Sequence, residues 1–159
     1  MKNDRFLLGI LIGIILIVLL SIGIVIFNPQ GSNYLPENSP EAVVNNYLTA
    51  WAQEDFDKVA GYLMEAENKP EFHKIIQTAY ETKYATDTTS VRIDKSILRD
   101  HEATVILTMI SHPGDPFSTT SQTSGLVALI KENDAWKIKQ FPYPFWGWDW
   151  YESQSITTK

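Results

Sequence analysis

Histidine and cysteine are the first residue types to consider for metal or nucleophilic chemistry in this chain. The three histidines, His73, His101 and His112, lie far apart, and none has a second ligand at metal-binding spacing. The sequence has no cysteine, which excludes disulfides and thiolate sites. It also has no HExxH, GxSxG or glycine-rich phosphate motif. We therefore predict no catalytic residue, no cofactor and no metal site.

Carboxylates could act as bases if an apolar pocket shifted their pKa values. Asp55 and Asp57 stand at the start of a short predicted helix, where capping accounts for them. Asp94 lies in a predicted strand and alternates with Val91 and Ile93, which places it on the polar side. These three positions therefore predict structural roles.

Aromatic and amide side chains are the better candidates for a binding site. Four of them form a second stripe on a predicted helix, which either lines a polar pocket wall or is a partly exposed helix edge. The stripe consists of His73, Gln77, Tyr80 and Tyr84. The other candidate pocket or recognition residues are Trp51, Trp136, Trp146, Trp148 and Trp150.

The segment 141–153, FPYPFWGWDWYES, concentrates aromatic residues near the C-terminus. Trp146, Trp148 and Trp150 alternate with other residues, so in an extended segment they would project from one side. The segment could fold back as a lid, present rings to a protein or carbohydrate, or dip into lipid headgroups. We favour the lid, because buried aromatic residues are commoner than exposed clusters.

Residues 6–27 contain no charge and only Ser21 as a polar side chain. A helix of this length spans about 33 Å, enough to cross a hydrocarbon core of about 30 Å. A cleaved signal peptide is the alternative, but the apolar run is long and no small-residue cleavage site follows it. Lys2 and Arg5 precede the segment, so we expect a single-pass plasma-membrane anchor with residues 1–5 in the cytoplasm and the C-terminal domain outside.

The chain has a net charge of −6, which argues against nucleic acid as a partner. The expected partner is the lipid bilayer through residues 6–27. A protein partner, a small apolar ligand and a homo-oligomer stay open. Gly9 and Gly13 have the spacing of a helix-dimer motif, although glycine is common in membrane helices in any case.

Residues 28–39 are rich in proline, asparagine and serine and predict a linker. A domain over 40–151 follows, and 152–159 form a tail. Helical periodicity begins near Pro40, Asp55 and Pro70, the third helix being expected to bury Phe72. Alternating patterns then predict strands over 89–98, 103–111, 124–131 and 135–141. The plan is α+β, with three helices packed on a curved antiparallel sheet of four or more strands.

The stretches SPEAVVNNYLTAWAQEDFDKVAGYL, HEATVILTMI and NDAWKI together resemble the nuclear-transport-factor-2-like (SnoaL-like, cystatin-like cone) superfamily. The resemblance implies a curved sheet wrapped around the first helix, with a cone whose mouth can hold a ligand. Enzymes of that superfamily place Asp, His or Tyr inside the cone, and no such residue can be matched here. Anchored domains of this type also resemble assembly factors of type IV secretion machines.

We therefore expect a membrane-anchored extracytoplasmic binding or scaffolding domain. The alternative is a small-molecule enzyme or ligand carrier that uses the cone. A buried Asp or His in an apolar pocket would favour the enzyme, and a cavity filled by Trp51, Phe72 and tail rings would favour the scaffold.

Overall fold

The computed structural model describes residues 10–11, 13–16, 34–114, 117 and 119–151. The chain divides into two units, Met1–Asn33 and Tyr34–Lys159. In the first unit, the described residues 10–11 and 13–16 are helical. The rest of the predicted 6–27 span lies outside the described residues, as do segments 1–5, 28–33 and 152–159. Among the residues that are described, no helix combines the length and apolar character needed to cross a bilayer.

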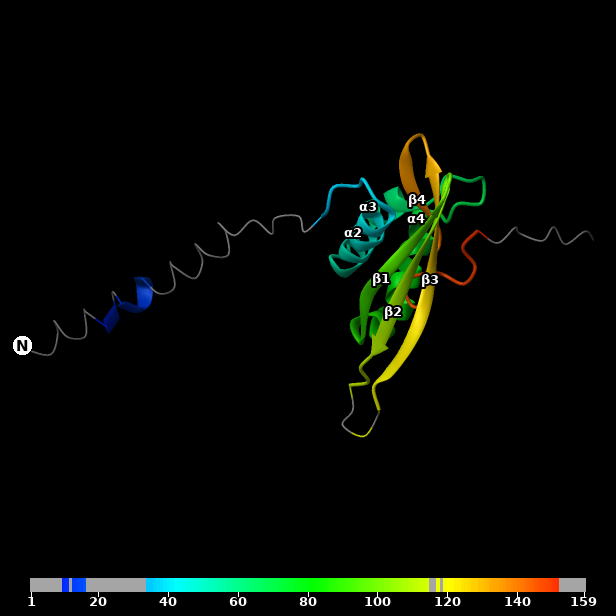
Figure 1. The fold of residues 1–159 in the computed structure, drawn as a ribbon. Helices are drawn as coiled ribbons and strands as arrows, with labels where there is room; N and C mark the ends of the chain where they lie inside the picture. The colour runs from blue at the N-terminus through cyan, green and yellow to red at the C-terminus, as the bar shows by residue number, and fades with distance from the viewer. Residues whose placement is uncertain (1–9, 12, 17–33, 115–116, 118, 152–159) are drawn as a thin grey trace, which may run out of the picture. The chain divides into compact units, whose positions relative to one another are not determined.

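The second unit has three helices followed by four strands (Figure 1). The helices are α2 (Pro40–Ala52), α3 (Phe56–Tyr62) and α4 (Phe72–Asp87), and the strands are β1 (Thr89–Arg99), β2 (Glu102–Ser111), β3 (Ser121–Glu132) and β4 (Ala135–Gln140). The sheet is antiparallel throughout, in the order β1-β2-β3-β4. The predicted α+β plan of three helices on a four-stranded antiparallel sheet is confirmed.

Local chemistry explains where the first two helices begin. The Ser39 hydroxyl accepts a hydrogen bond of 3.2 Å from the Ala42 amide, and Pro40 occupies the first helical position. The Asp55 carboxylate accepts one of 3.3 Å from the Lys58 amide. Both caps agree with the sequence prediction, and the Asp55 carboxylate has a structural role as the N-cap of α3.

The core lies between the helices and one face of the sheet. Buried residues recur at every second position in parts of β2, β3 and β4, so these side chains point inward. In β2 and β3, cross-strand pairing places Val105 beside Val127 and Ala103 beside Leu129, all of them buried. The fully buried side chains with the largest volumes are Tyr47, Leu63, Ile75, Leu107, Leu129 and Ile138.

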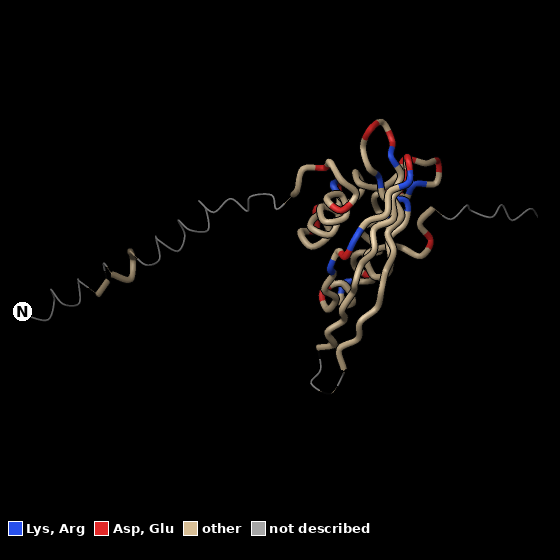
Figure 2. The backbone as a smooth tube through the Cα atoms, viewed as in Figure 1, with Lys and Arg blue, Asp and Glu red and all other residues tan. Residues whose placement is uncertain are grey.

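Two register shifts bend the sheet. One lies between Ile93 and Lys95 in β1, and the other lies opposite Ala128 and Leu129, where β4 has one extra residue. The middle of β2 and β3, residues 103–111 and 121–130, carries no charged residue (Figure 2). The charges of the two inner strands therefore lie only at their ends, at Glu102, Lys131 and Glu132.

Residues 34–39, which the sequence assigned to the linker, lie against the helices. The Asn46 side chain accepts a hydrogen bond of 2.7 Å from the Leu35 amide and donates one of 2.8 Å to the Leu35 carbonyl. The Tyr62 hydroxyl also donates to Glu37 at 2.8 Å. The polar composition of the segment did not predict these contacts, because the groups that hold it, the Asn46 amide and the Tyr62 hydroxyl, lie on helices further along the chain.

All members of the hydrophobic core fall between residues 43 and 150. A fragment that begins at Tyr34 therefore keeps the core complete, together with the contacts of Leu35 and Glu37. This fragment, residues 34–159, suits experiments in aqueous solution.

Candidate functional site

The aromatic segment after β4, residues 141–151, closes the interior of the domain, and we call it the closing segment. Trp150 is 4% exposed and Trp146 is 9% exposed, and Phe141 and Phe145 are also buried. The ring centroid of Trp51 lies 6.1 Å from that of Phe145 and 6.3 Å from that of Trp150. Of the three interpretations of this segment, burial describes Trp146 and Trp150.

Trp148 does not follow its two neighbours, because its side chain is 83% exposed. The expectation that the three tryptophans share one side assumed an extended segment. Residues 148–151 instead form a turn in which the Trp150 amide donates to the Gly147 carbonyl at 3.2 Å. The turn directs Trp146 and Trp150 inward and leaves Trp148 outside.

Buried polar atoms fix the segment to two helices. The Tyr47 hydroxyl donates to the Phe145 carbonyl at 2.6 Å, and the Trp150 indole N–H donates to the Thr78 hydroxyl at 3.2 Å. Burial raises the pKa of Tyr47 well above its ordinary value, and nearby Tyr151 adds to the effect. Tyr47 therefore stays neutral and acts as a hydrogen-bond donor to the backbone.

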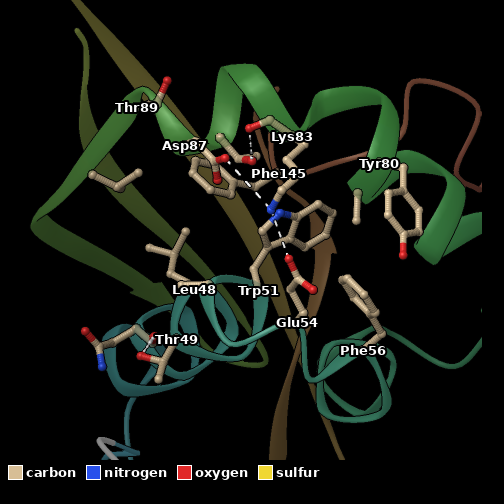
Figure 3. A pocket seen from close by; sticks show the side chains of 15 residues that line it. Leu48, Thr49, Trp51, Glu54, Phe56, Tyr80, Lys83, Asp87, Thr89 and Phe145 are labelled. Carbon is tan, nitrogen blue, oxygen red and sulfur yellow. Dashed lines mark hydrogen bonds and ion pairs between the residues drawn. The ribbon is translucent and has the colours of Figure 1, made fainter. Parts of the chain in front are cut away.

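A groove of about 480 Å³, which we call the Trp51 groove, lies between α2 and α4 (Figure 3). Its walls come from α2, α3, α4, the start of β1 and the closing segment. The lining residues are Asn45, Leu48, Thr49, Trp51, Ala52, Glu54, Phe56, Ala79, Tyr80, Lys83, Thr86, Asp87, Thr89, Val91 and Phe145. Apolar rings form much of the groove, and charged groups lie at its rim.

Lys83 on α4 reaches the segment after α2 at the rim of the groove (Figure 3). Its ammonium nitrogen lies 2.9 Å from a Glu54 carboxylate oxygen and 3.8 Å from one of Asp87. The hydrogen bond to Glu54, followed by the charge of Asp87, raises the pKa of Lys83. The ion pair thus joins two elements that border the groove.

A second groove, which we call the Trp148 groove, lies between α4 and the closing segment. It has a volume of about 420 Å³. Its lining residues are Lys74, Gln77, Thr78, Glu81, Thr82, Tyr143, Trp146, Gly147, Trp148 and Asp149. An ion pair of 3.0 Å joins Lys74 of α4 to Asp149 of the closing segment. Helix α4 therefore contributes one side to each groove.

The predicted polar stripe on α4 is divided between these surfaces. Tyr80 lines the Trp51 groove, and Gln77 lines the Trp148 groove. Tyr84 is exposed beyond both, and His73 is exposed near the helix start, where it pairs with Glu71 at 3.2 Å. The four residues are thus not brought together in one pocket wall.

Other predicted positions lie in the core or at its edge. Trp51 forms part of its groove and is itself buried, whereas Trp136 of β4 is buried in the core and lines neither groove. The expectation that Phe72 is buried is wrong, because this first residue of α4 is 46% exposed. Phe145 and Trp150, rather than Phe72, pack against Trp51.

Buried polar groups in the described part of the chain are engaged in structure. The buried polar side chains there are Asn46, Thr78, Thr82 and Thr108. Thr108 donates to Asp94 at 2.7 Å, and Thr82 donates to the Thr78 carbonyl at 2.9 Å. The bonds from Thr108 and then Arg92 lower the pKa of Asp94, so this carboxylate is a poor base. Across the described residues, no group of three metal-ligating side chains occurs.

The sequence did not indicate Leu48, Glu54 and Lys83 for the first groove, or Tyr143 for the second. Helical spacing places Leu48 beside Trp51 on α2, so the pattern held a usable signal for that residue. The Glu54–Lys83 pair joins residues 29 positions apart, and no local pattern predicts it. Tyr143 lies between two prolines, which indicated only an interrupted strand.

No family model matches the sequence. No curated protein matches it either.

Solved structures similar to this chain include three bacterial proteins at low identity. A SEC-C motif containing protein from Rhodopseudomonas palustris is 15% identical, with a TM-score of 0.47 over 68% of this chain and 80% of that one. An NTF-2 like protein of unknown function from Shewanella oneidensis MR-1 is 15% identical, with a TM-score of 0.43 over 62% and 90%. An NTF2-like protein from Campylobacter jejuni, named as a candidate transpeptidase, is 18% identical, with a TM-score of 0.48 over 64% and 98%.

Proposed function

We propose that this protein is a membrane-anchored, outward-facing binding module that holds the apolar part of a ligand in the Trp51 groove. The observation that carries the proposal is the filling of the interior by closing-segment rings, which leaves an aromatic-lined groove beside α2 and α4. Such a site offers apolar contact area and hydrogen-bonding groups. None of the described residues that line the groove is a buried carboxylate or a histidine.

The size and chemistry of the groove support binding of a small molecule or a few side chains of a partner. Ligand pockets of about 300–1,000 Å³ with apolar walls and a few polar groups are typical binding sites. Trp51, Phe56 and Phe145 supply the apolar surface. Thr49, Asn45 and Lys83 supply polar groups at the margin.

The anchor is supported by the sequence of residues 6–27, which is uncharged and long enough to cross a bilayer. Lys2 and Arg5 support a cytoplasmic N-terminus. Residues 28–159 carry 11 basic and 18 acidic residues, so an anionic membrane surface would repel the domain. A ligand in solution or on another protein suits this arrangement better than a lipid headgroup.

The groove is tested by titrating the fragment 34–159 with N-phenyl-1-naphthylamine, a neutral apolar probe that becomes fluorescent in apolar sites. Leu48→Asp places a charge on the groove wall and should weaken probe binding at least about tenfold. The matched control is Leu126→Asp, on a strand residue that is already exposed. Equal probe binding by both variants would refute the groove as the site.

The anchor is tested separately with the full chain in cells. Intact protein that retains Met1 should sediment with membranes and resist extraction by carbonate, while an external protease removes the domain. Recovery of a soluble product that lacks about the first 30 residues would refute the anchor and favour a cleaved signal peptide. This outcome would leave the groove experiment unaffected.

A further inference from the structure

Trp148 and Tyr143 are two large aromatic side chains that the Trp51 groove does not use. Trp148 is 83% exposed and Tyr143 is 66% exposed, and both line the Trp148 groove. Exposed single apolar residues are common. Here, however, the two rings share a groove of about 420 Å³ with hydrogen-bonding side chains of α4.

The turn that carries Trp148 is held in place on both sides. On the N-terminal side, the ring centroid of Trp146 lies 4.8 Å from that of Trp150. On the C-terminal side, Asp149 pairs with Lys74 of α4 at 3.0 Å, and the Trp150 indole is bonded to Thr78. Trp148 is therefore presented from an ordered support, which reduces the entropy lost when a ligand stacks on it.

Gly147 shows how tightly this turn is packed. A Cβ atom at this position would lie 2.1 Å from the Trp150 indole nitrogen. The absence of a side chain lets the Trp150 ring pack directly against the backbone that precedes Trp148. The exposed ring thus belongs to a close-packed turn and not to a loose end.

The α4 side of the groove supplies planar hydrogen-bonding groups. The Gln77 amide donates to the Glu81 carboxylate at 2.7 Å, one helical turn further on. This contact leaves the second Glu81 oxygen and the Gln77 carbonyl able to accept hydrogen bonds from a ligand. Aromatic surface beside amide and carboxylate groups can bind a molecule with both apolar C–H faces and many hydroxyl groups.

The charges of the groove disfavour an anionic ligand. Among the described lining residues, Lys74 is basic and Glu81 and Asp149 are acidic. Lys74 pairs with Asp149 at 3.0 Å, so the Glu81 carboxylate is the charge that an anion would meet. A neutral hydroxyl-rich ring avoids this repulsion and can donate hydrogen bonds to the carboxylates.

We propose that the Trp148 groove binds a neutral saccharide unit, with one sugar face stacked on Trp148 and hydroxyl groups bonded to Gln77, Glu81 and Asp149. Tyr143 extends the apolar contact to an adjacent part of the sugar or to the next unit of an oligosaccharide. The proposal does not depend on the Trp51 groove or on the membrane anchor.

The experiment is an NMR titration of ¹⁵N-labelled fragment 34–159 with chitotetraose, cellotetraose and xylotetraose, each up to about 20 mM, a range that detects weak binding. We expect at least one of them to shift the Trp148 indole resonance while the Trp51 indole resonance stays in place. Trp148→Ala should weaken the binding at least about tenfold, as measured on the neighbouring backbone amides.

Two matched variants separate this proposal from its alternatives. Tyr80→Ala removes a similarly exposed ring on the same helix at the other groove and should leave saccharide binding unchanged. Glu81→Gln removes a charge but keeps hydrogen-bonding capacity, so saccharide binding should persist. The absence of a Trp148 shift with all three sugars would overturn the proposal. A second outcome would also overturn it. If tetramethylammonium chloride, and none of the sugars, shifts the Trp148 indole resonance, and this shift disappears in Glu81→Gln, the groove is a cation site.

Discussion

The closing segment uses the same residue type in two opposite ways within five positions. Trp150 is buried, packs on Trp51 and bonds to Thr78, whereas Trp148 is exposed beside a groove. The contrast shows that residue type did not decide the role of each ring. The turn around Gly147 did, because it sends alternate tryptophans to different environments.

The largest expected difference comes from removing the buried ring. Trp150→Ala should lower the free energy of unfolding by about 3–5 kcal/mol, because it leaves a cavity beside Trp51 and removes the donor to Thr78. Chemical denaturation of the fragment 34–159, followed by circular dichroism, measures the change. A loss of less than about 1 kcal/mol would mean that the segment is not part of the core.

The packing of the turn is tested by Gly147→Ala. The added Cβ would overlap the Trp150 indole ring, so we expect a loss of about 1–3 kcal/mol from overpacking. Gly61→Ala is a suitable control, because an added Cβ there meets nothing within 4 Å. Equal stability of the two variants would contradict the close packing of the Trp150 ring against residue 147.

The attachment of the segment to α2 gives a smaller and pH-dependent effect. Tyr47→Phe removes the hydrogen bond to Phe145 and should cost about 0.5–1.5 kcal/mol at pH 7. Burial raises the pKa of Tyr47 in the folded state, while an unfolded tyrosine ionises near pH 10. The unfolded state therefore loses this proton first, and stability falls as the pH rises above about 10.

The variant removes one of the groups responsible for this alkaline loss. The free energy of unfolding of Tyr47→Phe should therefore fall less steeply with rising pH than that of the parent. The two slopes should differ by up to about 1.4 kcal/mol per pH unit. Denaturation curves at pH 9 and at about pH 11 check the difference. Identical slopes would show that Tyr47 ionises freely and is not enclosed.

The smallest expected effect on stability is that of Trp148→Ala. This ring is exposed, so the free energy of unfolding should change by no more than about 0.5 kcal/mol. A matched denaturation curve beside Trp150→Ala completes the comparison. A large destabilisation by Trp148→Ala would place this ring in the core and would contradict its role as an exposed binding surface in the Trp148 groove.

Periodicity was enough to predict the fold. The helix that begins at Pro40 and the cap at Ser39 follow from local signals, and so do the four strands, apart from shifts of up to three residues at their ends. These features depend on neighbours a few positions apart, which a sequence displays directly. Residues 34–39 escaped prediction because Asn46 holds them across eleven positions.

The sites were less predictable, because each depends on contacts between distant segments. Trp51 and Trp148 could be identified as candidates by residue type. The Glu54–Lys83 and Lys74–Asp149 pairs needed the packing of α4 against both of its neighbours. The alternation of the tryptophans was misleading, since it assumed an extended backbone where the chain turns.

The Asn46–Leu35 pair also determines how the domain would respond to tension on the chain that precedes it. A pull transmitted through residue 33 would load the contacts of Tyr34 with Gln53 and Lys58, and then the two hydrogen bonds between Leu35 and Asn46. These contacts would have to break before α2 could begin to unwind.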